Sequence, residues 1–174
     1  MIRRERRLTL WMIAASCLVS LTLGPDASAQ SKKVSVTGKM AGIQSQTTLF
    51  PGDSPAHQMI FVSRADVYSS ADADWNNAQS KVSGFADVTA GTGPHSGYHA
   101  ITHPGGDQTF TAYQGMGKRT TNADGSWVSN FDGKFRFVGG TGKFKGITGG
   151  GLYTGKGTPT SVEYEFTAEY TAAQ

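Results

Sequence analysis

Residues Val162–Tyr170 read VEYEFTAEY, and this stretch decides the fold. Its aromatic and aliphatic side chains occupy the even positions, whereas three glutamates and a threonine occupy the odd ones. Because successive side chains of a β-strand point to opposite faces, the alternation predicts a strand with one buried and one solvated face. One-sided burial is typical of antiparallel sheets, so the stretch indicates an antiparallel β protein.

Further strand-like runs precede this stretch, with alternation or with enrichment in β-branched and aromatic residues. Together with the last run they lie near Lys33–Ala41, His57–Tyr68, Lys81–Thr89, Gly97–Thr102, Gln108–Gly117, Ser126–Val138, Phe144–Thr154 and Ser161–Thr171. Segments with turn chemistry separate them, such as Gly91-Thr92-Gly93-Pro94 and Asn122-Ala123-Asp124-Gly125. Only Ser69–Ser80 carries a weak signal for a helical turn.

Glycine supports the same fold class and favours one form of it. The chain has 23 glycines, ten of which lie between Gly133 and Gly157. About eight strands with short links suit either a sandwich or a closed barrel. Closure removes exposed strand edges, and glycines permit the bending that closure requires. We therefore expect an all-β protein with a single eight-stranded antiparallel β-barrel over residues 30–174.

The first 29 residues read as a cleavable signal peptide. Four arginines between Arg3 and Arg7 precede an apolar stretch, Leu8–Leu23, and the small-residue triplet Ala27-Ser28-Ala29 follows. The apolar stretch is shorter than the ~20 residues that span a bilayer. We therefore expect an exported protein, periplasmic or secreted, without an integral membrane segment in the mature chain. The Sec and twin-arginine routes stay open.

Removal of the signal peptide changes the charge and cysteine content. The chain has 16 basic and 13 acidic residues, and the signal holds four and two of them, which leaves 12 against 11. A net charge of +1 without a basic block gives no indication of nucleic-acid binding. Cys17, the only cysteine, leaves with the signal. The mature protein therefore has no disulfide, no thiol nucleophile and no cysteine metal ligand.

The glycine-rich segment near the end of the chain resembles a known pattern. Val138–Gly146, followed by Gly149–Tyr153, is similar to the Gly-Gly-(Thr/Ala)-Gly-x-Phe segment and glycine-containing strand of dirigent proteins and allene oxide cyclases. Gly106-Asp107 with Tyr113-Gln114-Gly115 resembles a second part of the cyclase pattern, and Glu163–Phe166 resembles the aromatic last strand. The resemblance implies an eight-stranded barrel, often a homotrimer, that can hold an apolar small molecule.

The sequence departs from the cyclases at two places. The carboxylate that the plant cyclases carry on their first strand has no counterpart in Val34–Met40, and Lys81–Thr89 lacks the cysteine of the matching strand. The resemblance therefore implies a cavity for an apolar molecule and assigns no catalytic residue.

Two common site motifs are absent. Lys143 is followed by Phe144 where a phosphate-binding loop needs serine or threonine, and no Gly-x-Ser-x-Gly elbow occurs. We expect no dissociable cofactor and no metal. The segment Gly139–Gly151 is interpreted as architectural, with a tight turn and a strongly bent strand.

Three histidines, His95, His99 and His103, recur every fourth residue. Prolines and glycines around them argue against a helix. On a strand, neighbours in this series stand ~13 Å apart, so two of them cannot share a metal ion. They are interpreted as surface histidines or, for His99, as a proton-transfer group inside the barrel.

Four further side chains complete the candidate site. Arg64 and Asp66 share one face of a strand, where they form either an inward polar anchor or an outward ion pair at the rim. Tyr98 and Tyr113 either present a phenol to a ligand or pack in the core. The ligand-binding candidates are thus Arg64, Asp66, Tyr98, His99 and Tyr113.

Three functions remain open at this point. The leading hypothesis is an exported barrel that binds an apolar or lipid-like small molecule. The alternatives are a cofactor-independent cyclase or isomerase that acts in the cavity, and a structural, envelope-associated barrel filled by its own side chains. The barrel interior decides between them, because a cavity without polar groups favours binding and a cavity with a positioned acid, base or arginine favours catalysis.

Overall fold

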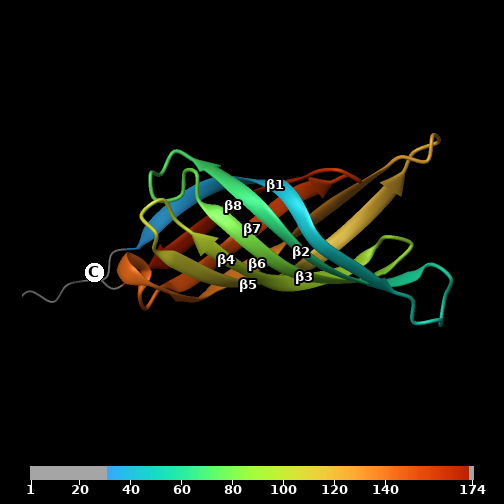
Figure 1. The fold of residues 1–174 in the computed structure, drawn as a ribbon, viewed down its shortest axis with the longest axis horizontal. Helices are drawn as coiled ribbons and strands as arrows, with labels where there is room; N and C mark the ends of the chain where they lie inside the picture. Colours follow the sequence, from blue (N-terminus) through green and yellow to red (C-terminus); the bar gives the residue numbers. More distant parts are fainter. Residues whose placement is uncertain (1–30, 173–174) are drawn as a thin grey trace, which may run out of the picture.

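The computed structural model describes residues 31–172, which form a closed barrel of eight antiparallel strands (Figure 1). The strands are β1 (Lys32–Leu49), β2 (His57–Ser70), β3 (Gln79–Thr89), β4 (Gly93–Thr102), β5 (Gln108–Thr121), β6 (Trp127–Gly140), β7 (Thr148–Gly157) and β8 (Val162–Thr171). A short 3₁₀ helix, η1 (Gly142–Phe144), lies between β6 and β7. Each strand pairs with the next one in sequence, and β8 pairs with β1. The predicted fold class is confirmed.

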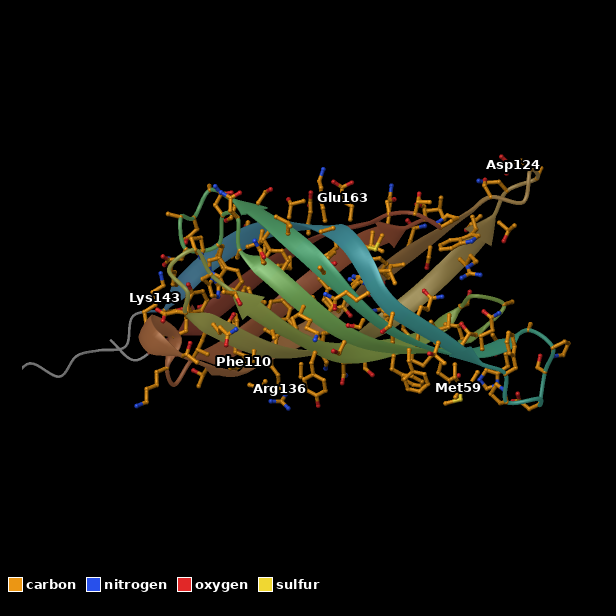
Figure 2. All side chains as sticks on the ribbon, viewed as in Figure 1. Met59, Phe110, Asp124, Arg136, Lys143 and Glu163 are labelled. Atoms are coloured by element: carbon orange, nitrogen blue, oxygen red, sulfur yellow. The ribbon has the colours of Figure 1, made fainter. Side chains whose placement is uncertain are left out.

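Alternation of side chains sets the inside and the outside of the barrel. In β8 the even positions from Tyr164 to Tyr170 are buried and the glutamates at the odd positions are exposed. In β6 the aromatic residues at odd positions face inward, whereas Lys134 and Arg136 face the solvent. Figure 2 shows Arg136 and Glu163 pointing away from the barrel wall. The period-2 patterns in the sequence therefore predicted these faces correctly.

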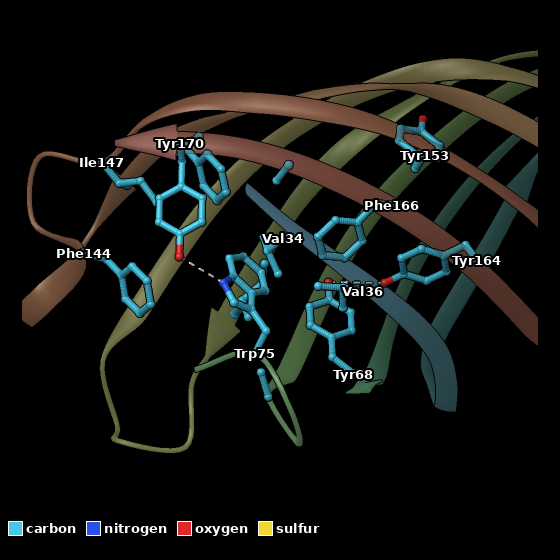
Figure 3. Close-up of a cluster of buried hydrophobic side chains, with 14 residues drawn as sticks. Val34, Val36, Tyr68, Trp75, Phe144, Ile147, Tyr153, Tyr164, Phe166 and Tyr170 are labelled. Carbon is cyan, nitrogen blue, oxygen red and sulfur yellow. Dashed lines mark hydrogen bonds between the residues drawn. The ribbon is translucent and has the colours of Figure 1, made fainter. Parts of the chain in front are cut away.

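An aromatic core closes one end of the barrel (Figure 3). Trp75, in the β2–β3 loop, is fully buried, and its indole Nε1 donates a hydrogen bond to the Tyr170 hydroxyl at 3.3 Å. The Trp75 ring also packs against His103 and against Phe144 of η1, with ring centroids 4.7 and 6.4 Å away. This end of the barrel is therefore filled by side chains.

The opposite end is formed by strands of unequal length. β1 pairs with β8 only as far as Lys39, but it continues along β2 to Leu49. The β5–β6 hairpin is paired up to Thr121 and Trp127, beyond the last pair between β6 and β7. Both hairpins project past the rest of the wall (Figure 1).

The structure corrects several predicted boundaries. β1 extends beyond Ala41 because β2 supplies a pairing partner for its second half. β4 begins at Gly93 and not at Gly97, because Gly93 pairs with Gly117 of β5. Phe144 lies in η1 and is buried, so β7 begins only at Thr148. The segment between β2 and β3 is a series of turns without a helix.

The glycines at the ends of β6 and β7 and in their connection have the backbone geometry expected of a tight turn. Gly142 and Gly149 have φ angles of +52° and +111°, in the region that a Cβ disfavours. At Gly140, a Cβ would come within 2.5 Å of the Phe144 carbonyl oxygen. The chain can therefore turn tightly here and place Phe144 in the core.

The expected signal peptide, residues 1–29, lies outside the described residues. Within residues 31–172, none of the helices is long and apolar enough to cross a membrane.

Candidate ligand cavity

The barrel encloses a cavity of about 270 Å³ next to the aromatic core. The cavity runs from Trp75 and Ile101 toward the opposite end, where Gly91, Trp127 and Thr158 line it. Its wall is mainly apolar, with Ile60, Val62, Val88, Phe131, Phe135 and Phe166 among the lining residues. The polar side chains that reach the cavity are Arg64, Tyr68, His95, His99, Thr111, Tyr113, Arg119, Ser129, Tyr153, Thr158 and Tyr164.

Arg64 and Asp66 form an ion pair inside the barrel. The Arg64 Nε and Nη2 atoms donate to the two Asp66 oxygens at 2.9 and 3.2 Å, and the Tyr164 hydroxyl donates to Oδ2 at 2.8 Å. The Asp66 side chain is fully buried and that of Arg64 is 17% exposed. Burial opposes the Arg64 charge, but Asp66 nevertheless raises the pKa of Arg64. Of the two interpretations, the inward polar anchor agrees with the structure.

His99 lies within hydrogen-bond distance of a second buried phenol. The Tyr68 hydroxyl is 2.9 Å from His99 Nδ1 and 3.3 Å from the Tyr164 hydroxyl, which itself donates to Asp66. The Ser80 hydroxyl lies 3.1 Å from the same nitrogen. Burial, with a contribution from Arg64, lowers the pKa of His99 to about 4. The ring is therefore neutral at pH 7.

The interpretation of the three histidines as surface residues is wrong. The odd positions of β4 face inward, so His95 and His99 reach the cavity and His103 follows them into the aromatic core. His95 Nε2 lies 2.7 Å from the Tyr153 hydroxyl. His103 is 2% exposed, donates from Nδ1 to the Asp74 carbonyl at 2.8 Å and accepts from Thr109. Burial lowers the pKa of His95 and His103 as well.

The two candidate tyrosines lie on opposite sides of the wall. Tyr113 lines the cavity, and its hydroxyl lies above Gly84 and Gly97, where a Cβ would come within 2.7 and 2.6 Å of it. Glycine at these two positions leaves room for the phenol. Tyr98 has the opposite parity to His99 on β4 and is 62% exposed on the outer face. Tyr98 therefore does not face the cavity, because the pleat directs it outward.

Four of the five candidate residues predicted from the sequence lie close together in the structure, and several of their neighbours were not predicted. Arg64, Asp66, His99 and Tyr113 lie in or beside one cavity. A role for them in binding a ligand stays a prediction. The missed residues are Tyr68, Ser80, Tyr153, Tyr164, Arg119 and Trp127. The alternation had placed Tyr164 and Trp127 on buried faces, but a pattern along one strand does not show which residues meet across a barrel.

Metal coordination finds no support in the described residues. Within the range 31–172, no three histidine, cysteine, aspartate or glutamate side chains lie close enough together to hold a metal ion. The expected independence from metals and cofactors stays a prediction.

The comparisons with known proteins concern the fold. No protein-family model matches the chain, and neither does any curated protein. Solved structures that align with it include the pterocarpan synthase dirigent protein PsPTS1, with 11% identity, a TM-score of 0.48 and coverage of 83% of this chain and 97% of that one. GePTS1, also a pterocarpan synthase dirigent protein, aligns with 10% identity, a TM-score of 0.49 and coverage of 91% and 98%.

A further solved structure is a protein of unknown function from Clostridium acetobutylicum, with 14% identity, a TM-score of 0.25 and coverage of 80% and 96%. Likenesses of this degree carry no statement about activity. What the strand pairing and the cavity define is a class of molecule, a small β-barrel with an internal cavity.

Proposed function

We propose that the mature protein is exported and binds an apolar small molecule inside its barrel. The cavity supports this most directly, because it is closed at one end by the aromatic core and has mainly apolar walls. Its volume of about 270 Å³ lies near the lower end of the ~300–1,000 Å³ that ligand sites usually have. A few hydrogen-bonding groups, such as Arg64, His99 and Tyr113, would orient the ligand.

A cofactor-independent isomerase or cyclase is the second candidate, because two arginines and two histidines reach the cavity, among them Arg64 and His99. The protonation and hydrogen bonding of the groups around the cavity favour binding over catalysis. His99 is held neutral by burial and has a pKa of about 4, far from the value near 7 that suits a general base. Burial raises the pKa of Tyr113, and Asp66 is engaged by Arg64 and Tyr164. A structural barrel filled by side chains is at odds with the cavity.

Titration with 1-octanol tests the proposal. This neutral molecule has about nine heavy atoms, which matches a cavity equal to roughly nine times the ~30 Å³ of a water molecule. Tryptophan fluorescence reports binding, because both Trp75 and Trp127 line the cavity. Trp127→Phe identifies the source of the signal.

Two variants on β3 separate cavity binding from surface binding. Ala86→Phe adds a ring to the cavity wall, and Ser83→Phe adds one to the exposed face of the same strand. We expect Ala86→Phe to weaken 1-octanol binding about tenfold or more while Ser83→Phe binds as the wild type does. Absence of binding by the wild type, or equal binding by both folded variants, would contradict the proposal.

Export is tested separately. We propose cleavage after Ala29, so protein recovered from the periplasm or the culture medium of an expressing bacterium should begin at Gln30. Retention of the full-length chain in the cytoplasm would contradict this. The trimer implied by the family resemblance remains a proposal that sedimentation of the mature protein can test.

A further inference from the structure

Arg119 lies on the inner face of β5, near the end of the barrel opposite the aromatic core. Its side chain lines the cavity. The residue belongs to the part of the β5–β6 hairpin that projects past the start of β4 (Figure 1). Its side chain packs directly over Gly91 in the β3–β4 turn, where a Cβ would come within 2.7 Å of the arginine Cβ, Cδ and Nε atoms. Glycine at position 91 thus leaves the space that Arg119 occupies.

The guanidinium of Arg119 stacks on an aromatic ring but has no ion-pair partner among the described residues. Its carbon lies 4.2 Å above the centre of the Trp127 ring, in a cation–π arrangement. The Nε atom is buried and forms no hydrogen bond. None of the ion pairs formed within residues 31–172 involves Arg119. A buried donor without an acceptor is costly, so this packing of Arg119 calls for a compensating interaction at the rest of the guanidinium.

Arg119 also carries the uncompensated charge of the cavity. The other arginine in its lining, Arg64, is neutralised by Asp66 through two hydrogen bonds. The lining histidines, His95 and His99, have pKa values lowered by burial and are neutral at pH 7. Among the described residues that line the cavity there is no carboxylate. The cavity thus combines apolar walls with a positive charge at one end.

We propose that the cavity binds a small amphipathic carboxylate, with its carboxylate on Arg119 and its apolar tail directed toward Phe131 and Tyr153. This inference rests on the proposed function and names the class of ligand. The planar guanidinium offers parallel donors that match the two oxygens of a carboxylate. The cavity volume of about 270 Å³ corresponds to a tail of roughly seven to eight carbons beside the carboxylate, taking ~30 Å³ for each group.

The test compares octanoate with 1-octanol, which share the tail and differ in charge. Both are titrated below the concentration at which octanoate forms micelles, with Trp127 fluorescence as the readout and calorimetry as a second one. Arg119→Met removes the charge and keeps much of the side-chain stem. Arg119→Lys keeps the charge but loses the two parallel N–H donors of the guanidinium. Arg136→Met is the matched control, because Arg136 is exposed on the outer face (Figure 2).

We expect the wild type to bind octanoate about tenfold or more tightly than 1-octanol. Arg119→Met should lose this preference, because it should weaken octanoate binding much more than 1-octanol binding. Arg119→Lys should retain part of the preference, and Arg136→Met should retain all of it. Thermal melting confirms that each variant is folded.

The possible outcomes distinguish an error in the assignment to Arg119 from an error in the proposed function. Equal binding of the two ligands by the wild type would overturn the assignment to Arg119 and leave apolar binding intact. A preference for octanoate that survives in Arg119→Met would place the anion elsewhere and also overturn the assignment. Failure of both ligands to bind would contradict the proposed function itself.

Discussion

Replacement of Asp66 by asparagine should destabilise the barrel strongly although it changes the side-chain volume very little. The Asp66 side chain is fully buried and accepts three hydrogen bonds, two from Arg64 at 2.9 and 3.2 Å and one from Tyr164 at 2.8 Å. Asparagine keeps the shape but leaves the guanidinium without a counter-charge. Breaking a buried ion pair in this way costs about 3–5 kcal/mol.

The structure sets the expected value at the low end of that range. The Arg64 side chain is 17% exposed and reaches the cavity, where water can solvate part of its charge. We therefore expect a loss of about 3 kcal/mol in the free energy of unfolding. For a domain of this size, each kcal/mol corresponds to about 2–4 °C in melting temperature, so the melting temperature should fall by about 6–12 °C.

Urea denaturation of four proteins provides the assay: the wild type, Asp66→Asn, Arg64→Met and the double variant. The double variant removes both charges, so it should be more stable than the sum of the two single effects predicts. The stability curves should be measured at pH 7. A loss below about 1 kcal/mol for Asp66→Asn, or strict additivity in the cycle, would refute the view that the pair is a buried and mutually dependent unit.

Three further predictions concern the glycine turn, the aromatic core and pH. Gly142→Val should lower the free energy of unfolding by about 1–3 kcal/mol, because the φ angle of Gly142 is +52° and a Cβ would overlap the Asp107 carboxylate. The 1-octanol affinity of the folded fraction should stay unchanged. Unchanged melting with lost binding would show that the segment is a ligand loop instead. Trp75→Ala should cost about 3–5 kcal/mol in urea denaturation, and a loss below about 1 kcal/mol would contradict a packed end. The pKa of His99 is about 4 in the folded protein and near 6.5 when unfolded, so between these values only the unfolded chain binds this proton. Stability should therefore decrease by up to about 3 kcal/mol as the pH is lowered from 6.5 to 4, and His99→Gln should flatten this part of the curve.

Much of the architecture follows from local patterns in the sequence. The alternation in Val162–Tyr170 predicted the buried face of β8, and the same logic predicted the inward aromatic residues of β6. The errors occur where pairing with another strand overrides local chemistry. Gly93 and Pro94 have turn composition, yet they pair with Gly117 and Met116 and begin β4.

The candidate site was less predictable, because it depends on neighbours that are distant in sequence. Arg64 and Asp66 stand two residues apart, so a shared face was foreseeable, but the inward orientation was not. Tyr164 reaches Asp66 from β8, 98 residues further along the chain. The burial of His103 depends on Trp75 in another loop, so the sequence around the histidine alone suggested a surface position.

Arg119 shows a further limit of sequence reasoning. Its position in β5 is compatible with an ordinary surface arginine, since a lysine precedes it and a threonine follows it. Its inward direction follows from the register of β5 against β4 and β6, and the space beside it depends on Gly91. The absence of a partner for its Nε atom is visible only when the described residues have been placed in three dimensions.

The central claim is that the interior of the barrel receives a ligand, and a crystal structure with 8-bromooctanoate tests it most directly. Anomalous scattering locates the bromine without reference to the rest of the map. We predict the bromine inside the barrel beside Phe131 and Tyr153, with the carboxylate at Arg119. Bromine on the outer face of the wall, or an interior that side chains fill completely, would contradict the claim.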